Sequence, residues 1–193
     1  MQNFNKIKNV LTKKEADDFK NIFLKNTPTL SNLGDKCYGI DINNTASYLW
    51  CKKFFFSKIQ TYFKEDMKLI FAFYSSFTKP FAIHTDLKPL PNNATGRPFV
   101  SCLIPVSVDN RPENCGLAST VFFRSDTSSV SEQDRKKHLS HCQPVQLENK
   151  QIDQIVKWSP LDMIWWKSEL DHCSSHFINF KTKECFVIHT YVE

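Results

Sequence analysis

Glycine is scarce in this sequence. The 193 residues include four glycines, which are dispersed along the chain: Gly34, Gly39, Gly96 and Gly116. Loops that bind phosphate need clustered glycines, because their backbone N–H groups must close around the anion. Gly34 and Gly39 are suitably spaced for such a loop, but Ile40 and Asp41 follow them in place of Lys and Ser or Thr. The sequence therefore excludes a P-loop and a dinucleotide-binding glycine fingerprint.

Paired cysteines and long apolar runs are also absent. The seven cysteines include no C-x-x-C pair, and the opening residues MQNFNKIKNV lack the apolar segment of a secretion signal. The longest apolar stretches, FFF at 54–56 and LIFAFY at 69–74, are too short to cross a bilayer. These features predict a reduced, cytoplasmic protein without a membrane-spanning segment.

Charge of either sign is not concentrated in one region. The formal net charge of +5 comes from 25 Lys and Arg against 20 Asp and Glu, and the basic residues are spread along the chain. Nucleic-acid-binding domains gather basic residues into a patch or stripe, so the sequence argues against a nucleic-acid partner. Hydrophobic residues make up 41% of the chain and aromatic residues 13%. We therefore expect a single domain over residues 1–193 with a dense core.

The first 66 residues are predicted to be mainly helical support. Thr12 and Glu15 match a capping box, which places a helix start at this point. A second amphipathic helix is expected over about 47–65, and its broad apolar face comprises Leu49, Phe54, Phe55, Ile59 and Phe63. The polar segment between the two helices, which contains Pro28 and Gly34, is predicted to be a loop.

From residue 68 the hydrophobic period becomes two. Short apolar or aromatic runs are separated by clusters of Pro, Asn, Asp and Ser: KLIFAFYSSF (68–77), FVSCLIPVSV (99–108), STVFFRS (119–125), LDMIWW (161–166) and ECFVIHTYV (184–192). Helices followed by strands, without βαβ alternation, predict an α+β domain with largely antiparallel sheets. We expect a jelly-roll core over 67–193 with N-terminal bracing helices, interrupted by a polar, lid-like insertion at 126–157.

Two histidine neighbourhoods could carry chemistry. In FAIHTDLKPL, His84 and Asp86 are two residues apart, so in an extended segment both side chains point to the same side. In ELDHCSSHF, His172 and His176 directly follow a predicted strand. Two histidines and one carboxylate form the facial triad of non-haem Fe(II), which leaves adjacent positions open for a co-substrate and oxygen. The pattern alone does not choose between His172 and His176.

At these residues the chain resembles the 2-oxoglutarate- and Fe(II)-dependent dioxygenases, in particular the prolyl-hydroxylase-like members. The resemblance covers roughly residues 68–193 and follows the family's order, from a strand leading into HTD to HCSSHF and a basic residue before the last strand. It implies a double-stranded β-helix, a cupin-like jelly roll. It also implies that His84, Asp86 and His172 are the catalytic residues and bind Fe(II), with 2-oxoglutarate and O2 as co-substrates. Hydroxylation would accompany decarboxylation of 2-oxoglutarate to succinate and CO2.

The resemblance further implies a basic residue that binds the far carboxylate of 2-oxoglutarate. Lys183 is the best match, with Lys181 as its competitor, although most of the family uses Arg at this place. Cys185 stands where a Ser or Thr often helps to bind the same carboxylate. Tyr74, on the strand before the HTD motif, is the candidate for a replacement hydroxyl.

Other residues receive plainer interpretations. His189 is interpreted as a buried histidine of the last strand, Trp165 and Trp166 as core residues on opposite sides of a strand, and Arg97 and Lys88 as surface residues. A structural zinc ion is an alternative hypothesis, for which six residues could in principle supply ligands: His138, His141, Cys142, His172, Cys173 and His176. Their loose spacing favours solvated loop residues instead.

The resemblance leaves the substrate open between a small molecule and an amino-acid or peptide side chain. Nucleobase demethylation is disfavoured, because the DNA-repair members carry paired Arg after the distal His and this chain has none there. Two other functions would share the fold: a cupin-type metal isomerase or sugar-binding barrel, and a non-catalytic interaction domain. Joint binding of Fe(II) and 2-oxoglutarate distinguishes the oxygenase from both.

Overall fold

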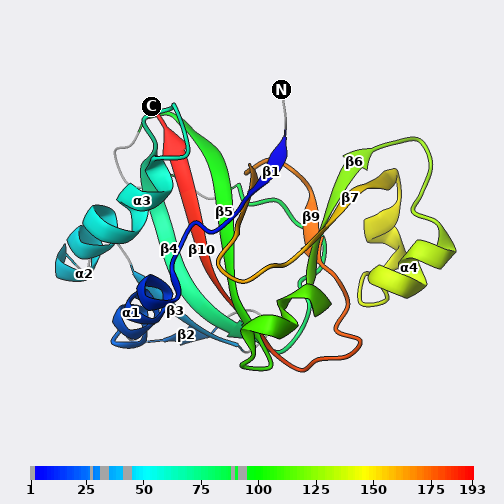
Figure 1. Cartoon of the computed structure of the whole chain (residues 1–193). Coiled ribbons are helices and arrows are strands. Elements are labelled where there is room, and N and C mark those ends of the chain that lie inside the picture. Colours follow the sequence, from blue (N-terminus) through cyan, green and yellow to red (C-terminus); the bar gives the residue numbers. More distant parts are fainter. Residues whose placement is uncertain (1–2, 27, 31–34, 41–44, 88–89, 91–94) are drawn as a thin grey trace.

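Two antiparallel sheets pack against each other in the computed structural model (Figure 1), which describes residues 3–26, 28–30, 35–40, 45–87, 90 and 95–193. The large sheet contains, in spatial order, β1 (Phe4–Ile7), β8 (Met163–Lys167), β5 (Arg97–Val108), β10 (Lys183–Val192), β4 (Lys68–Phe77), β3 (Lys36–Ile40) and β2 (Thr29–Leu30). The small sheet contains β7 (Lys150–Lys157), β6 (Ser119–Ser125) and β9 (His172–Ser174). The strands predicted from the period of two are therefore present, and β1, β2 and β3 add strands from the region expected to be helical.

Helices cover one face of the large sheet, as Figure 1 shows on its left side. They are α1 (Lys13–Leu24), α2 (Thr45–Trp50), a π-helical segment (Cys51–Phe56) and α3 (Ser57–Gln60). The predicted capping box at Thr12 and Glu15 is present at the start of α1. Phe55 is fully buried and its ring contacts Phe19, Phe23 and Phe186, which joins the helices to β10. None of the described helices combines the length and apolar character needed to span a membrane.

The second helical segment differs from the expected amphipathic helix in its ends and in its face. It covers 45–60, not 47–65. Phe55 and Ile59 are buried, whereas Leu49 and Phe54 are 57% and 48% exposed. The π-helical turn explains the difference, because its wider i to i+5 bonding shifts the positions that follow relative to a regular α-helical period.

Strand alternation separates two faces of the large sheet. On β10, Phe186 and Ile188 belong to the core under the helices, whereas Cys185 and Val187 belong to a second core between the two sheets. The odd-numbered residues of this part of β10, which include Lys183, therefore face the small sheet. This second core also contains Phe122 and Trp166, and it borders the cavity described below.

The segment predicted to be a polar insertion is partly built into the fold. It contains α4 (Glu132–His138) and a 3₁₀ turn (Pro144–Leu147), but its last eight residues form β7 of the small sheet. A further 3₁₀ helix, Pro112–Leu117, connects β5 and β6. Leu139, Cys142 and Leu147 are buried against β6 and β9 in a third hydrophobic cluster. The polar composition of 150–157 predicts part of an insertion, whereas these residues form a strand. The composition is polar because β7 is an edge strand with exposed or half-buried residues along most of its length.

Candidate metal centre

Backbone pairing brings the two histidine neighbourhoods together. The segment after β4 runs antiparallel to β9, so that the N–H of His84 donates to the carbonyl of His172 and the N–H of His172 donates to that of His84, each at 3.0 Å. The N–H of Asp86 donates to the carbonyl of Ser168 at 2.8 Å. The two imidazole rings lie side by side, with centroids 4.4 Å apart. His84, Asp86 and His172 are thus placed by the sheet framework itself.

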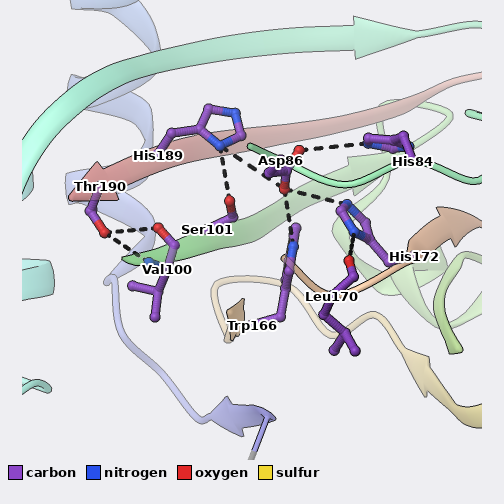
Figure 2. A network of polar contacts seen from close by, with 9 residues as sticks. All are labelled: His84, Asp86, Val100, Ser101, Trp166, Leu170, His172, His189 and Thr190. Carbon is purple, nitrogen blue, oxygen red and sulfur yellow. Dashed lines mark hydrogen bonds and ion pairs between the residues drawn. The ribbon is translucent and has the colours of Figure 1, made fainter. Parts of the chain in front are cut away.

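The side chains of these three residues converge on one point (Figure 2). Nε2 of His84 is 3.7 Å from Oδ1 of Asp86, and Nε2 of His172 is 3.4 Å from Oδ2. One ligand atom from each residue lies within 4.8 Å of the others. Bonds of about 2.1 Å at right angles to one another place neighbouring ligand atoms about 3.0 Å apart. A small contraction would therefore bring all three onto one metal ion.

Hydrogen bonds to the backbone fix which imidazole nitrogen is available. Nδ1 of His84 lies 2.8 Å from the carbonyl of Ala82, and Nδ1 of His172 lies 2.9 Å from the carbonyl of Leu170. Because a carbonyl oxygen can only accept, both Nδ1 atoms carry the proton and both Nε2 atoms present a lone pair. Metal-binding histidines use this arrangement, in which the second nitrogen donates to a carbonyl or carboxylate.

The charge state of the cluster suits a cation. Burial lowers the pKa of His172 to about 4, so its ring is neutral at neutral pH. Burial opposes ionisation of Asp86, but the three nearby histidines and the hydroxyl of Ser101 hold its pKa below the usual value. Imidazole lone pairs and a carboxylate that face one another at 3.4 to 3.7 Å repel unless a cation or a proton lies between them. The residues present fit a bound divalent metal.

Two further buried residues lie beside Asp86. The indole N–H of Trp166 donates to Oδ2 of Asp86 at 3.0 Å. His189 places its Nδ1 4.0 Å from the same oxygen and 2.9 Å from the hydroxyl of Ser101 on β5. His189 and Trp166 were interpreted as core residues, and they are indeed buried, but both also line the cavity. His189 and Lys183 are both odd-numbered residues of β10. The alternation of side chains along the strand could therefore have placed His189 on the side of the cavity.

Lys183 is buried at the other end of the same cavity. Its side chain is almost inaccessible, its ammonium donates to the hydroxyl of Ser174, and it lies 4.7 Å from the ring centroid of Trp158. The rings of Phe77 and Phe177 complete an aromatic cage. Burial lowers the pKa of Lys183 to about 8. Among the described residues no carboxylate forms an ion pair with it, so an anionic ligand would supply the missing countercharge.

Lys181, the competitor for this role, is exposed, and its backbone N–H donates to Asp109. The structure does not bring Tyr74 to this cavity. Its ring packs on Phe186 on the helix-covered face of the large sheet, and burial, followed by the hydrogen bond of its hydroxyl to Glu184, raises the pKa of the phenol. Side chains alternate between the two faces along β4, so Phe73 and Phe77 face the cavity and Tyr74 faces away from it. The hydroxyl beside Lys183 belongs to Ser174.

The cavity between the triad and Lys183 has a volume of about 490 Å³. Its wall includes six Phe and Trp rings, those of Phe71, Phe73, Phe77, Phe81, Trp158 and Trp166. Arg97 is exposed at the start of β5 and lies outside the lining residues, whereas Lys88 lies outside the described residues. The cavity is therefore lined by both a metal-binding triad and a buried cation.

Comparison with known proteins gives structural relatives only. No protein-family model and no curated protein sequence matches the chain. Among solved structures, the α-ketoglutarate-dependent carbocyclase SnoK from nogalamycin biosynthesis superposes with a TM-score of 0.65 at 11% identity, covering 99% of this chain and 80% of SnoK. HygX from Streptomyces hygroscopicus with nickel and 2-oxoglutarate gives 0.59 at 10% identity, covering 98% and 83%. A Pseudomonas putida prolyl-4-hydroxylase gives 0.54 at 11% identity, covering 100% and 94%.

SnoK and the prolyl-4-hydroxylase differ in the reaction named for them, but all three relatives share one architecture. Sequence identities this low speak for the fold alone. The α+β class and the jelly-roll core expected from the sequence are confirmed. The chain has the double-stranded β-helix fold of the 2-oxoglutarate- and Fe(II)-dependent oxygenases.

Proposed function

We propose that the protein is an Fe(II)- and 2-oxoglutarate-dependent oxygenase. His84, Asp86 and His172 would hold the iron, and Lys183 would bind the far carboxylate of 2-oxoglutarate. The observation that carries the proposal is the pairing of two complementary features in one cavity: a triad of metal ligands and a buried lysine without a carboxylate partner among the described residues. The fold of the structural relatives supports the same assignment.

The lysine is suited to a carboxylate for electrostatic reasons. An ammonium in a water-poor cage interacts more strongly with an anion than it would at the surface, because the local dielectric constant is low. The hydroxyl of Ser174 accepts from Lys183 and keeps its own hydrogen available for a carboxylate oxygen. A lysine provides one point charge without the two-pronged geometry of arginine. Ser174 would then supply the second contact.

The triad would leave the cavity side of the metal free. Iron bound there, with 2-oxoglutarate and O2, supplies an oxidant that places one oxygen atom in a substrate C–H bond and the other in succinate, with release of CO2. The indole N–H of Trp166 holds Asp86 in place, and His189 lies beside it. The aromatic rings of the lining give this side of the metal an apolar surface.

We propose hydroxylation as the outcome and a small molecule or an amino-acid or peptide side chain as the substrate. The aromatic wall favours an apolar group next to the triad. The ring centroids of Phe81 and His84 are 5.7 Å apart, and those of Phe73 and His189 are 6.2 Å apart. Structural relatives include both kinds: HygX is known with hygromycin B bound, and another relative is a viral collagen prolyl hydroxylase.

An anaerobic titration with Fe(II) and 2-oxoglutarate tests the assignment. The chelate of iron with 2-oxoglutarate gives a visible charge-transfer band, which we expect for the wild-type protein and not for Asp86→Ala. Lys183→Met should require much more 2-oxoglutarate for the same band, whereas the exposed control Lys181→Met should not. Iron binding without the band would instead favour a metal-binding barrel of another class. Failure to bind either would favour a non-catalytic domain.

A further inference from the structure

A second group of metal-binding side chains lies outside the cavity triad. His141 and Cys142 follow α4 in the segment between β6 and β7, and Cys173 lies on β9, directly after His172. One ligand atom from each of the three lies within 4.8 Å of the others. Cys173 is buried with Cys142 in the hydrophobic cluster beneath α4. The three residues are separated by up to 32 positions in sequence, and the fold brings them together.

The hydrogen bonding of His141 determines which of its ring nitrogens can bind a metal ion. Nε2 lies 3.0 Å from the carbonyl of Phe81, which can only accept, so Nε2 carries the proton and Nδ1 presents the lone pair. Both thiols are buried, at 3% and 1% exposure, and neither forms a disulfide. The Nδ1 lone pair of His141 and the sulfur atoms of Cys142 and Cys173 are therefore available to a shared zinc ion.

A fourth residue, His176, lies next to the group. Its ring stacks on that of His141, with centroids 6.0 Å apart, and its backbone N–H donates to the carbonyl of His138 at 2.8 Å. The Nδ1 atoms of His141 and His176 are both buried and have no hydrogen-bond partner among the described residues. A buried polar atom that stays without a hydrogen-bond partner is destabilising. Two such atoms on adjacent rings beside two buried thiols mark a place for a metal ion; His176 lies outside the group whose ligand atoms are within 4.8 Å of one another, and a shift of its ring would bring it in as the fourth ligand.

We propose that His141, Cys142, Cys173 and His176 form a structural Zn²⁺ site. Four protein ligands with no open position are typical of structural zinc, and two thiolates neutralise the charge of the ion. The sulfur and imidazole set differs from the cavity triad, whose carboxylate suits Fe(II). The two sites would therefore select different metals on chemical grounds. This assignment does not depend on the proposed oxygenase activity.

The site would fasten the segment after α4 to the strand that serves the cavity. β9 is three residues long, and its alternation turns His172 and Ser174 toward the cavity while Cys173 meets the opposite cluster. Zinc bound to Cys173 on one face of β9 would thus fix the positions of a candidate iron ligand and of the hydroxyl beside Lys183. His141 adds a second connection, because its Nε2 lies 3.0 Å from the carbonyl of Phe81, which lines the cavity.

Cobalt provides a probe that distinguishes the two sites. The reduced, metal-stripped full-length protein is titrated with Co²⁺ under anaerobic conditions and then with Zn²⁺. Thiolate ligation in a tetrahedral site gives thiolate-to-cobalt charge-transfer absorption and intense visible bands, neither of which the His84–Asp86–His172 set can produce. We expect these bands to saturate at one equivalent and to disappear on addition of Zn²⁺. Their absence in reduced, folded wild-type protein would overturn the proposal.

Variants and a second spectroscopy complete the test. Cys142→Ser and Cys173→Ser should lose the thiolate bands, whereas Cys37→Ser, on β3 and away from the group, should retain them. X-ray absorption of the wild-type zinc protein should show two sulfur and two nitrogen neighbours. Because this measurement needs no variant, it tests the ligand set even if a variant fails to fold. A shell of oxygen and nitrogen alone would refute the ligand set. Asp86→Ala should keep the cobalt bands and lose the iron chelate band, so each proposal can fail separately.

Discussion

Replacement of Lys183 by Met should change how stability depends on pH. Lys183 is buried, and its pKa falls from 10.5 to about 8 because burial disfavours the charged ammonium. The folded-state pKa lies below that of the unfolded chain, so between these values the unfolded state holds a proton that the native state has lost. The unfolding free energy of the wild type must therefore rise with pH in this window. Below pH 8 both states carry the charge, and the native state is destabilised by burying it.

The size of the effect follows from the same values. Each pKa unit corresponds to ~1.4 kcal/mol, so complete titration of Lys183 adds about 3 kcal/mol to the stability of the wild type. Between about pH 7 and pH 9.5, the part of the window that is easiest to measure, the expected gain is about 2 kcal/mol. Lys183→Met removes the titrating group and keeps a side chain of similar length. The variant should lack this gain.

Urea unfolding of both proteins across this pH range provides the assay. The seven thiols and the other titrating groups are common to both chains, so the difference between the two unfolding free energies isolates Lys183. Lys181→Met is the matched control, and because that side chain is exposed its curve should run parallel to the wild type. Parallel curves for wild type and Lys183→Met would refute the reasoning, since they would show that burial does not disfavour the ammonium.

Three further substitutions test separate parts of the structure. Trp166→Phe removes the indole donor to Asp86 and should weaken Fe(II) binding about 10–100-fold in a metal titration; unchanged affinity would show that this bond does not orient the carboxylate. Phe55→Ala should lower the unfolding free energy by about 3–5 kcal/mol in urea, because the ring is fully buried between helix and sheet; a loss below about 1 kcal/mol would contradict that packing. Thr12→Ala removes the capping box of α1 and should cost about 1 kcal/mol. Thermal unfolding checks this value, and an unchanged midpoint would argue against the cap.

The strands and the candidate ligands could be predicted because their signals are local. The runs at 68–77 and 119–125 coincide with β4 and β6, since a period of two over several residues defines a half-buried strand. The H-x-D spacing of His84 and Asp86 likewise places both side chains on one side of an extended segment. These predictions need no knowledge of what lies across the sheet.

Features that depend on pairing between distant segments could not be predicted in this way. His189 lies near Asp86 because β10 pairs with β5 in a register that sets His189 opposite Ser101. Nothing in the sequence states that register, so His189 was interpreted as a plain core residue. Tyr74 is predicted as a 2-oxoglutarate-binding hydroxyl because it is close to the HTD motif in sequence. On β4, however, its side chain points to the face opposite the cavity. The zinc hypothesis failed to choose its ligands for the same reason, because Cys173 meets Cys142 only through the contact of β9 with the insertion.

The position of β10 has a consequence for the order in which the protein can fold during synthesis. This strand lies at the centre of the large sheet, between β5 and β4, yet it follows every other described strand in the sequence (Figure 1). Until it leaves the ribosome, β1, β8 and β5 have no hydrogen-bonded connection to β4, β3 and β2. A nascent chain therefore exposes two unpaired edges, which are templates for aggregation. The same late strand carries Lys183 and His189, so the cavity acquires its cation in the step that joins the two halves of the sheet.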